Sequence, residues 1–109
     1  VQLATGDGVG TDRGFVRGGT IVCTIGSTTA PIVERLAAPK EKGRLATAPD
    51  LRLRGSADAW AVGDCASILN AHDGQPSPPT GQFAERQGRQ CAENIVRVLR
   101  GEPTRPFSF

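Results

Sequence analysis

The sequence predicts an α/β fold in which a small sheet packs against one long C-terminal helix. Residues 20–25 form an apolar, β-branched run that does not alternate in polarity, as expected of a buried, parallel strand. A second apolar run, residues 59–62, leads directly into a glycine and an aspartate. Residues 82–100 repeat their apolar positions at helical spacing, and Gly101 and Pro103 follow as stop signals. A chain of 109 residues has room for one such unit with a modest core.

The N-terminal 17 residues predict a β-hairpin. Residues 1–4 alternate in polarity, and the tripeptide Gly-Asp-Gly at residues 6–8 is a typical turn. Residues 5–14 are rich in glycine, threonine and aspartate and predict the loop at the hairpin tip, with residues 15–17 as the return strand. We expect this hairpin to stand beside the small sheet.

Shorter elements are predicted between the hairpin and the long helix. Residues 32–37 form a short helix that Pro39 ends. Residues 44–47 and 51–53 are two short strand candidates. Residues 67–80 are mostly polar, contain three prolines and predict a long loop, a kind of segment that is often functional.

The long helix has two distinct faces. Helical spacing places its larger side chains together on one face: Phe83, Gln87, Cys91, Ile95, Val98 and Leu99. A stripe of small residues at intervals of four lies beside them: Ala84, Gly88 and Ala92. Close helix-on-sheet packing and the close approach of a flat ring both explain this stripe, and the sequence leaves the two open.

Composition limits the classes of function. The net charge is only +2 and both signs are mixed along the chain, so nucleic-acid binding has little support. No apolar run approaches the roughly 20 residues that span a bilayer. Three cysteines, none in a Cys-x-x-Cys pair, and a single histidine predict neither a disulfide framework nor a metal site. Reduced thiols fit a cytoplasmic protein.

Gly63 and Asp64 are the most informative pair in the chain. The glycine permits a tight turn at the carboxyl end of the apolar run 59–62, and this end of a strand is where open α/β sheets bind ligands. The Asp64 carboxylate can accept strong hydrogen bonds from the hydroxyls of a ribose or a polyol. A Gly-Asp pair is also an ordinary turn, so its surroundings decide its meaning.

Those surroundings resemble a known superfamily. A strand ending at Gly26, a strand ending at Gly63-Asp64 and a Pro-rich loop opening a helix follow one another. This order is similar to the second half of the FAD-binding domain in pyridine nucleotide-disulfide oxidoreductase-like flavoproteins. Within them, residues 78–88 (Pro-Pro-Thr-Gly-Gln-Phe-Ala-Glu-Arg-Gln-Gly) resemble the Pro-Thr-Ala-Gln-x-Ala-x-x-Gln-Gly pattern of type II (alternative) NADH:quinone oxidoreductases. Gly81 stands where that pattern has alanine.

The resemblance implies a role for each matching residue. Asp64 would bond the ribityl chain of FAD, and neighbouring backbone amides such as that of Cys65 would lie near the pyrophosphate, with Gly63 in the same cofactor-binding turn. Gln82 and Phe83 would begin a helix aimed at the isoalloxazine ring, where free N–H groups and the helix dipole favour the negative charge of a reduced flavin. Further implied roles are contact with the diphosphate or adenosine side for Thr24 and Gly26, and a place on the quinone-facing side for Gln82 and Gln87.

The resemblance also implies a division of the chain and its partners. Residues 1–17 would be the hairpin that closes the NAD-binding insertion, and residues 18–109 the second half of a Rossmann-like FAD-binding domain. In full-length relatives a hydride passes from NADH to FAD, and electrons then pass to a quinone. Because the dinucleotide fingerprint and the second nucleotide-binding unit are not in this sequence, we expect weak FAD binding or none, no activity alone and a partner in the rest of its own flavoprotein chain. We also expect homodimers or strand exchange through apolar edges, and a full-length protein on the inner membrane face.

Two other interpretations remain open. One is a small non-catalytic binding or assembly module that keeps the flavoprotein fold. The other is a piece of a sulfide:quinone or ferredoxin reductase-like enzyme. Sulfide enzymes use redox cysteines, whereas Cys23 and Cys65 lie at strand ends without a suitable pair and predict buried structural roles.

Overall fold

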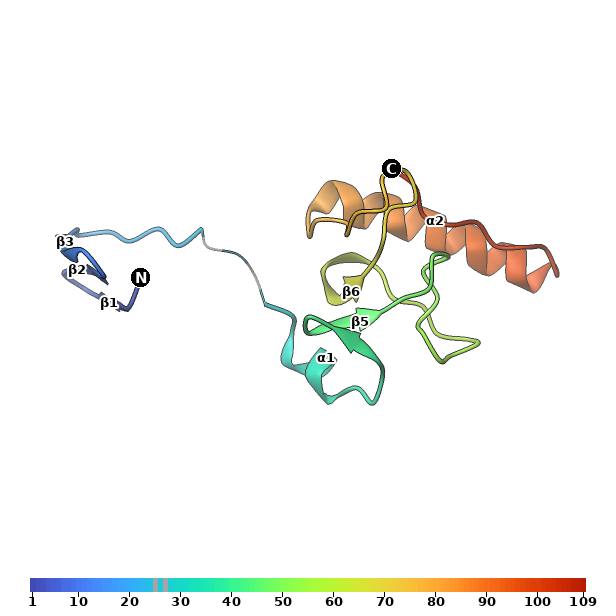
Figure 1. Cartoon of the computed structure of the whole chain (residues 1–109), viewed down its shortest axis with the longest axis horizontal. Coiled ribbons are helices and arrows are strands. Elements are labelled where there is room, and N and C mark those ends of the chain that lie inside the picture. The colour runs from blue at the N-terminus through green and yellow to red at the C-terminus, as the bar shows by residue number, and fades with distance from the viewer. Residues whose placement is uncertain (25, 27) are drawn as a thin grey trace.

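Two three-stranded sheets and one long C-terminal helix make up the computed structural model, which describes residues 1–24, 26 and 28–109 (Figure 1). The α/β prediction is confirmed at this level. The elements follow in the order β1 (Leu3–Thr5), β2 (Gly8–Thr11), β3 (Gly14–Arg17), α1 (Pro31–Arg35), β4 (Lys40–Glu41), β5 (Arg44–Ala46), the 3-10 turn η1 (Gly63–Cys65), β6 (Ala66–Ser67) and α2 (Gly81–Leu99).

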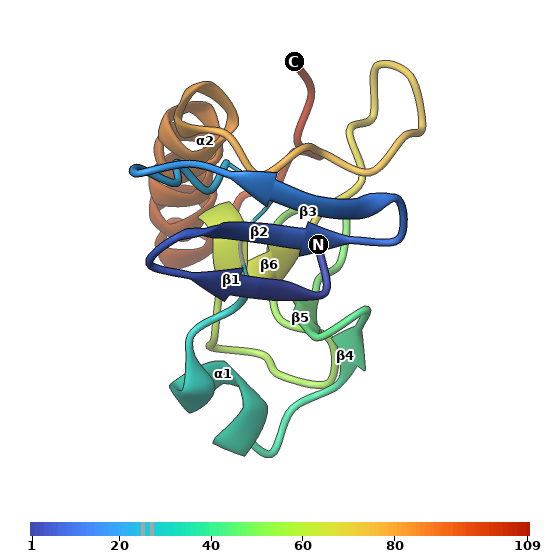
Figure 2. The same cartoon turned by 90° about the vertical axis from the view of Figure 1, so that its left-hand side faces the viewer.

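The N-terminal strands form an antiparallel meander in the order β1-β2-β3 (Figure 2). The prediction of a simple hairpin with a tip loop over residues 5–14 was wrong, because β2 lies inside that range. Glycine is needed at Gly8, since a Cβ there would lie 2.2 Å from the Val16 carbonyl oxygen. Glycines lowered the apparent strand propensity of this stretch, yet here they allow close strand contact.

The meander does not stand beside the second sheet as expected. Residues 18–30 connect it to α1, and Figure 1 shows it apart from the remainder of the structure, residues 31–109, which we call the α/β body. Among the described residues, no hydrogen bond or ion pair joins the meander to this body. Side chains on its strands are correspondingly open to solvent, including Phe15 at 52% and Val16 at 62% exposure.

The strand predicted over residues 20–25 is not present. The described part of this range, residues 20–24, has no strand, and Ile25 lies outside the described residues. Val22 is 79% exposed, and Cys23, predicted to be buried, is exposed as well. A β-branched run favours a strand only where a neighbouring strand supplies hydrogen bonds, and none of the described strands lies beside this one.

The sheet of the α/β body is therefore built from other residues. β4 pairs with β5 in antiparallel fashion, and β5 pairs with β6 in parallel. The predicted strand 59–62 is extended but bridges to the chain at a single point, Trp60 opposite Arg52. Its backbone bonds link Leu53 N–H to the Ala59 carbonyl and Ala61 N–H to the Leu51 carbonyl. This ribbon carries the chain into η1.

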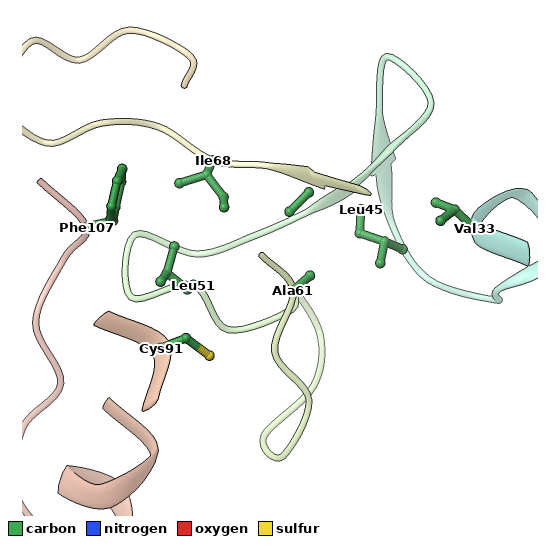
Figure 3. Packing of buried hydrophobic residues seen from close by; sticks show 8 residues of the cluster. Val33, Leu45, Leu51, Ala61, Ile68, Cys91 and Phe107 are labelled. Atoms are coloured by element: carbon green, nitrogen blue, oxygen red, sulfur yellow. The ribbon is translucent and has the colours of Figure 1, made fainter. Parts of the chain in front are cut away.

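The core lies between the sheet, α1, α2 and the segment after α2 (Figure 3). Its buried members come from every part of the α/β body: Val33, Leu45, Leu51, Ala61, Ala66, Ile68, Cys91 and Phe107. Full burial of one of the larger side chains, such as Leu51 or Phe107, stabilises the fold by about 1.5–3 kcal/mol. The core therefore holds η1 and α2 in one packed unit.

The helix α2 is confirmed, beginning at Gly81 and ending at Leu99. Gly101, with a φ of +70°, ends it as predicted, and the Glu102 N–H donates to the Arg97 carbonyl beyond it. Its buried residues are Gln87, Cys91 and Asn94. The predicted face was wrong at its C-terminal end, where Leu99 is 81% exposed.

Candidate functional site

The Gly-Asp pair lies in a single 3-10 turn, η1, between an extended ribbon and β6. Val62 enters the turn in extended conformation, and Gly63 has a φ of +73°, a region that side-chain-bearing residues rarely adopt. The Ala66 N–H donates to the Gly63 carbonyl and closes the turn. Asp64 is exposed at its centre. The turn thus presents a carboxylate to solvent at the end of the ribbon, as the sequence predicts.

The turn is fixed directly to α2. The Gly63 N–H donates to the Oε1 atom of Gln87 at 2.8 Å, and Gln87 is only 3% exposed. A Cβ on Gly63 would lie 3.6 Å from the Cβ of Ala84, so the two backbones approach closely. The small-residue stripe therefore serves packing at Ala84. Gly88 has open space around it and Ala92 is exposed.

The first turn of α2 faces outward. Thr80 occupies the N-cap position, and its side chain makes no capping hydrogen bond. The first N–H groups of a helix have no intrahelical acceptor, and together with the dipole they favour a negative partner. Gln82 is exposed on this turn and Phe83 is half-buried. Because a Cβ on Gly63 would already reach Ala84, near the start of the helix, the Asp64 turn and the helix N-terminus belong to one local unit.

An aromatic cluster adjoins this helix start. The Phe83 and Phe109 rings meet edge to face with centroids 4.7 Å apart, and Phe107 lies 6.3 Å from Phe83 on the buried side. The Arg86 guanidinium lies 3.9 Å above the centre of the Phe109 ring, a cation–π contact. A cleft of about 380 Å³ runs along the same helix, and Gln82, Arg86 and Ser108 are among its lining residues.

The cysteines do not form a redox centre. Cys65 is half-buried, and its thiol donates to the Val62 carbonyl at 3.3 Å. Burial, with a smaller contribution from the negative charge of Asp50, raises the pKa of the Cys91 thiol. Cys91 therefore stays protonated at neutral pH and is a poor nucleophile or metal ligand.

Two predicted site residues are not brought to the turn. Thr24 and Gly26 lie in the connection that precedes α1, where the Gly26 N–H donates to the Thr24 carbonyl at 3.2 Å. Both are exposed. Figure 1 shows this connection running away from α2 toward the meander. The five residues that do gather are Gly63, Asp64, Cys65, Gln82 and Phe83, with Gln87 behind them.

Sequence reasoning missed two buried asparagines, Asn70 and Asn94, which are 3% and 0% exposed. Asn70 lies in the segment predicted to be a polar loop. Asn94 lies three residues after Cys91, on the buried side of α2. An amide at a core position of a helix is a usable signal, because such a group must find hydrogen-bond partners.

The fold and the site together define a class: an α/β unit that presents a carboxylate turn beside a helix N-terminus without a side-chain cap. No protein-family model matches the chain. Three related proteins are each named Type II NADH:quinone oxidoreductase. The chain is 32% identical over 90 residues to the protein of Staphylococcus saprophyticus, and 35% and 34% identical over 91 residues to those of Staphylococcus epidermidis and Staphylococcus aureus.

These matches confirm the resemblance to type II NADH:quinone oxidoreductases. They cover 83–84% of this chain but only 22–23% of each relative, so the chain spans less than a quarter of the length of the proteins it matches.

Among the described residues, no helix combines the length and the apolar character needed to cross a membrane.

Proposed function

We propose that this chain forms one part of the FAD site in a Rossmann-like domain of an NADH:quinone oxidoreductase. The observation that carries the proposal is the hydrogen bond from Gly63 to Gln87, because it ties the carboxylate turn to the helix whose first two residues, 81 and 82, are exposed. Similarity to the staphylococcal enzymes over most of the chain supports the same reading.

The exposed groups fit this cofactor. Asp64 is an exposed acceptor that would take hydrogen bonds from the ribityl hydroxyls, and the Gly63 and Cys65 backbone would line the turn toward the pyrophosphate. Gln82 and Phe83 would face the isoalloxazine ring, with the N–H groups of the first helical turn stabilising negative charge on it. When bound, FAD supplies the hydride and electron chemistry between NADH and a quinone.

The proposed roles of the other predicted residues depend on parts of the site that lie outside the turn and the first turn of α2. Gln82 is exposed and free to reach the quinone side. The Oε1 atom of Gln87 is already used by Gly63, so we propose that Gln87 supports the quinone side by holding the turn. For Thr24 and Gly26 to approach the diphosphate or adenosine, the connection before α1 would have to lie alongside the body.

The division at residue 17 and the partnership with the rest of a flavoprotein belong to the same proposal. The aligned relatives are more than four times longer than their matched segment. Under this proposal the residues beyond that segment supply the diphosphate-binding loop and the NADH site. The 109-residue chain alone then binds FAD weakly and does not oxidise NADH.

The decisive experiment uses a chimaera in which the matched residues replace the aligned segment of the Staphylococcus epidermidis relative. We expect the chimaera to hold FAD, measured by flavin absorbance and by fluorescence titration. Asp64→Asn should weaken FAD binding roughly ten- to hundredfold, because hydrogen bonds to a charged group are worth about 1.5–3 kcal/mol.

Asp58→Asn is the matched control, since Asp58 is also exposed and precedes the same ribbon. It should leave FAD affinity unchanged. Equal affinity of the Asp64→Asn and parent chimaeras would refute the role of Asp64, and a chimaera that folds without binding flavin would refute the proposal as a whole.

A further inference from the structure

The segment that follows α2 is held by hydrogen bonds spaced as in a β-strand, although the groups that supply them do not belong to a strand. In residues 105–109 every second residue has both its N–H and its carbonyl hydrogen-bonded: Arg105, Phe107 and Phe109. A period of two is the bonding pattern of one edge of a β-strand. No strand lies beside this segment among the described elements.

Asn94 of α2 holds the first of these residues. Its Oδ1 atom accepts the Arg105 N–H at 2.9 Å, and its Nδ2 group donates to the Arg105 carbonyl at 2.8 Å. The same Nδ2 group donates to the Asp50 carbonyl at 2.9 Å. The side-chain amide thus pairs with Arg105 as the peptide group of a neighbouring strand would, and it is fully buried.

Asn70 holds the last of these residues in the same way. Its Oδ1 atom accepts the Phe109 N–H at 2.9 Å, and its Nδ2 group donates to the Phe109 carbonyl at 2.8 Å. Between the two asparagines, the Phe107 N–H donates to the Pro49 carbonyl, and the Phe107 carbonyl accepts the Ala71 N–H, both at 2.8 Å.

The opposite edge of the segment is left unpaired. Pro106 has no N–H to offer a further strand, and among the described residues the Ser108 N–H has no acceptor. Ser108 lines the cleft along α2. One edge of the segment is thus saturated, while the other is open and partly blocked by proline.

We propose that Asn70 and Asn94 are positioning residues that set the register of residues 105–109 against α2. A shift of one residue would turn Phe107 and Phe109 to the wrong side. The observed register buries Phe107 to 1% exposure and brings the Phe109 ring against Phe83 and under Arg86. The two amides therefore determine the aromatic surroundings of the first turn of α2. This holds whether or not that turn binds a flavin.

Amide hydrogen exchange in the unaltered chain tests the register directly. The N–H groups of Arg105, Phe107 and Phe109 should exchange slowly, and the Ser108 N–H between them should exchange at least about tenfold faster. Uniform exchange across residues 105–109 would overturn the proposal. Slow exchange of the Ser108 N–H together with fast exchange of the Phe107 and Phe109 N–H groups would overturn it as well.

Asn70→Ala tests the positioning role. It removes both hydrogen bonds between Asn70 and Phe109, so it should speed exchange of the Phe109 N–H at least about tenfold and should abolish the Phe83–Phe109 nuclear Overhauser contact. Contacts between Phe83 and Phe107 should persist, because Phe107 keeps its own backbone partners.

Two further variants separate positioning from general destabilisation. Asn70→Asp keeps an acceptor for the Phe109 N–H but loses the donor to the Phe109 carbonyl, so it should restore only part of the protection. Leu69→Ala removes an adjacent exposed side chain and should change neither readout. An unchanged Phe83–Phe109 contact in Asn70→Ala, or an equal loss in Leu69→Ala, would refute the role of Asn70.

Discussion

Single buried amides organise the candidate site more than its apolar residues do. Gln87 lies where a helical pattern would ordinarily place a leucine, yet its Oε1 atom accepts the Gly63 N–H. A buried or half-buried N–H without a partner is costly, so this amide contributes by satisfying the turn rather than by filling space. The closeness of the turn to α2 therefore depends on a specific atom.

Replacing Gln87 should show this dependence. Gln87→Leu keeps a similar volume but leaves the Gly63 N–H without its acceptor, so we expect a loss of about 1–3 kcal/mol in the free energy of unfolding. Urea denaturation measures it. The same change at exposed Gln82 serves as control and should fall within about 0.5 kcal/mol of the parent. Equal effects at both positions would contradict this role for Gln87.

For single residues, the sequence predicts which side chain carries the chemistry better than it predicts which residues contact one another. Asp64 could be chosen because the Gly-Asp pair ends an apolar run and is followed by a Pro-rich loop and a helix, and Asp64 does lie exposed in a turn that is bonded to α2. The partner of Gly63 could not be predicted, since a bond between residues 24 positions apart depends on how the elements pack. Asn94 was missed because helical spacing weights apolar residues and ignores a buried polar one.

At the scale of the elements, two glycines differ in whether the backbone requires them. Gly63 has a φ of +73° in the turn, whereas Gly88 lies within α2, where a Cβ would meet nothing within 4 Å. The first requires glycine for its conformation. Gly88 is not required by the folded backbone and only increases the conformational entropy of the unfolded chain.

Alanine at each position should therefore have effects of opposite sign. Gly63→Ala should lower the free energy of unfolding by about 1–2 kcal/mol, because a Cβ disfavours left-handed backbone. Gly88→Ala should raise it by about 0.5–1 kcal/mol through helix propensity. Thermal or urea unfolding of the two variants side by side is the measurement. A stabilised Gly63→Ala variant would show that the turn does not hold this conformation in solution.

The elements that sequence predicts well are those that carry their own hydrogen bonds. Helix α2 was placed to within one residue at each end, because its bonds are internal and Gly101 ends it. The strand over residues 20–25 was predicted wrongly from an equally clear pattern, since a strand needs a neighbour that local sequence does not encode. The short strand β5, inside the predicted range 44–47, succeeded because β4 and β6 flank it.

In the whole molecule, the meander and the α/β body are structurally separate. The Cα radius of gyration is 18.6 Å, compared with about 13 Å for a compact domain of this length. The separation visible in Figure 1 accounts for the difference.

Removing the meander should therefore leave the body intact. A chain of residues 18–109 should unfold within about 0.5 kcal/mol of the parent, the range of neutral surface changes, when followed by Trp60 fluorescence in urea. Trp60 reports on the body because it lies in the ribbon before η1. A large loss of stability would show that the meander packs on the body in solution.

The hydrogen bond between Gly63 and Gln87 also means that the distance between the Asp64 turn and α2 does not depend on the length of the loop that joins them. The spacing between the Asp64 turn and the start of α2 is fixed across space, and residues 72 and 73, at the exposed tip of the loop between them, are not among the residues that fix it. Insertions or deletions at that tip can alter chain length without shifting the carboxylate relative to the helix. Evolution and protein engineering alike could remodel this loop while keeping the ligand-facing arrangement unchanged.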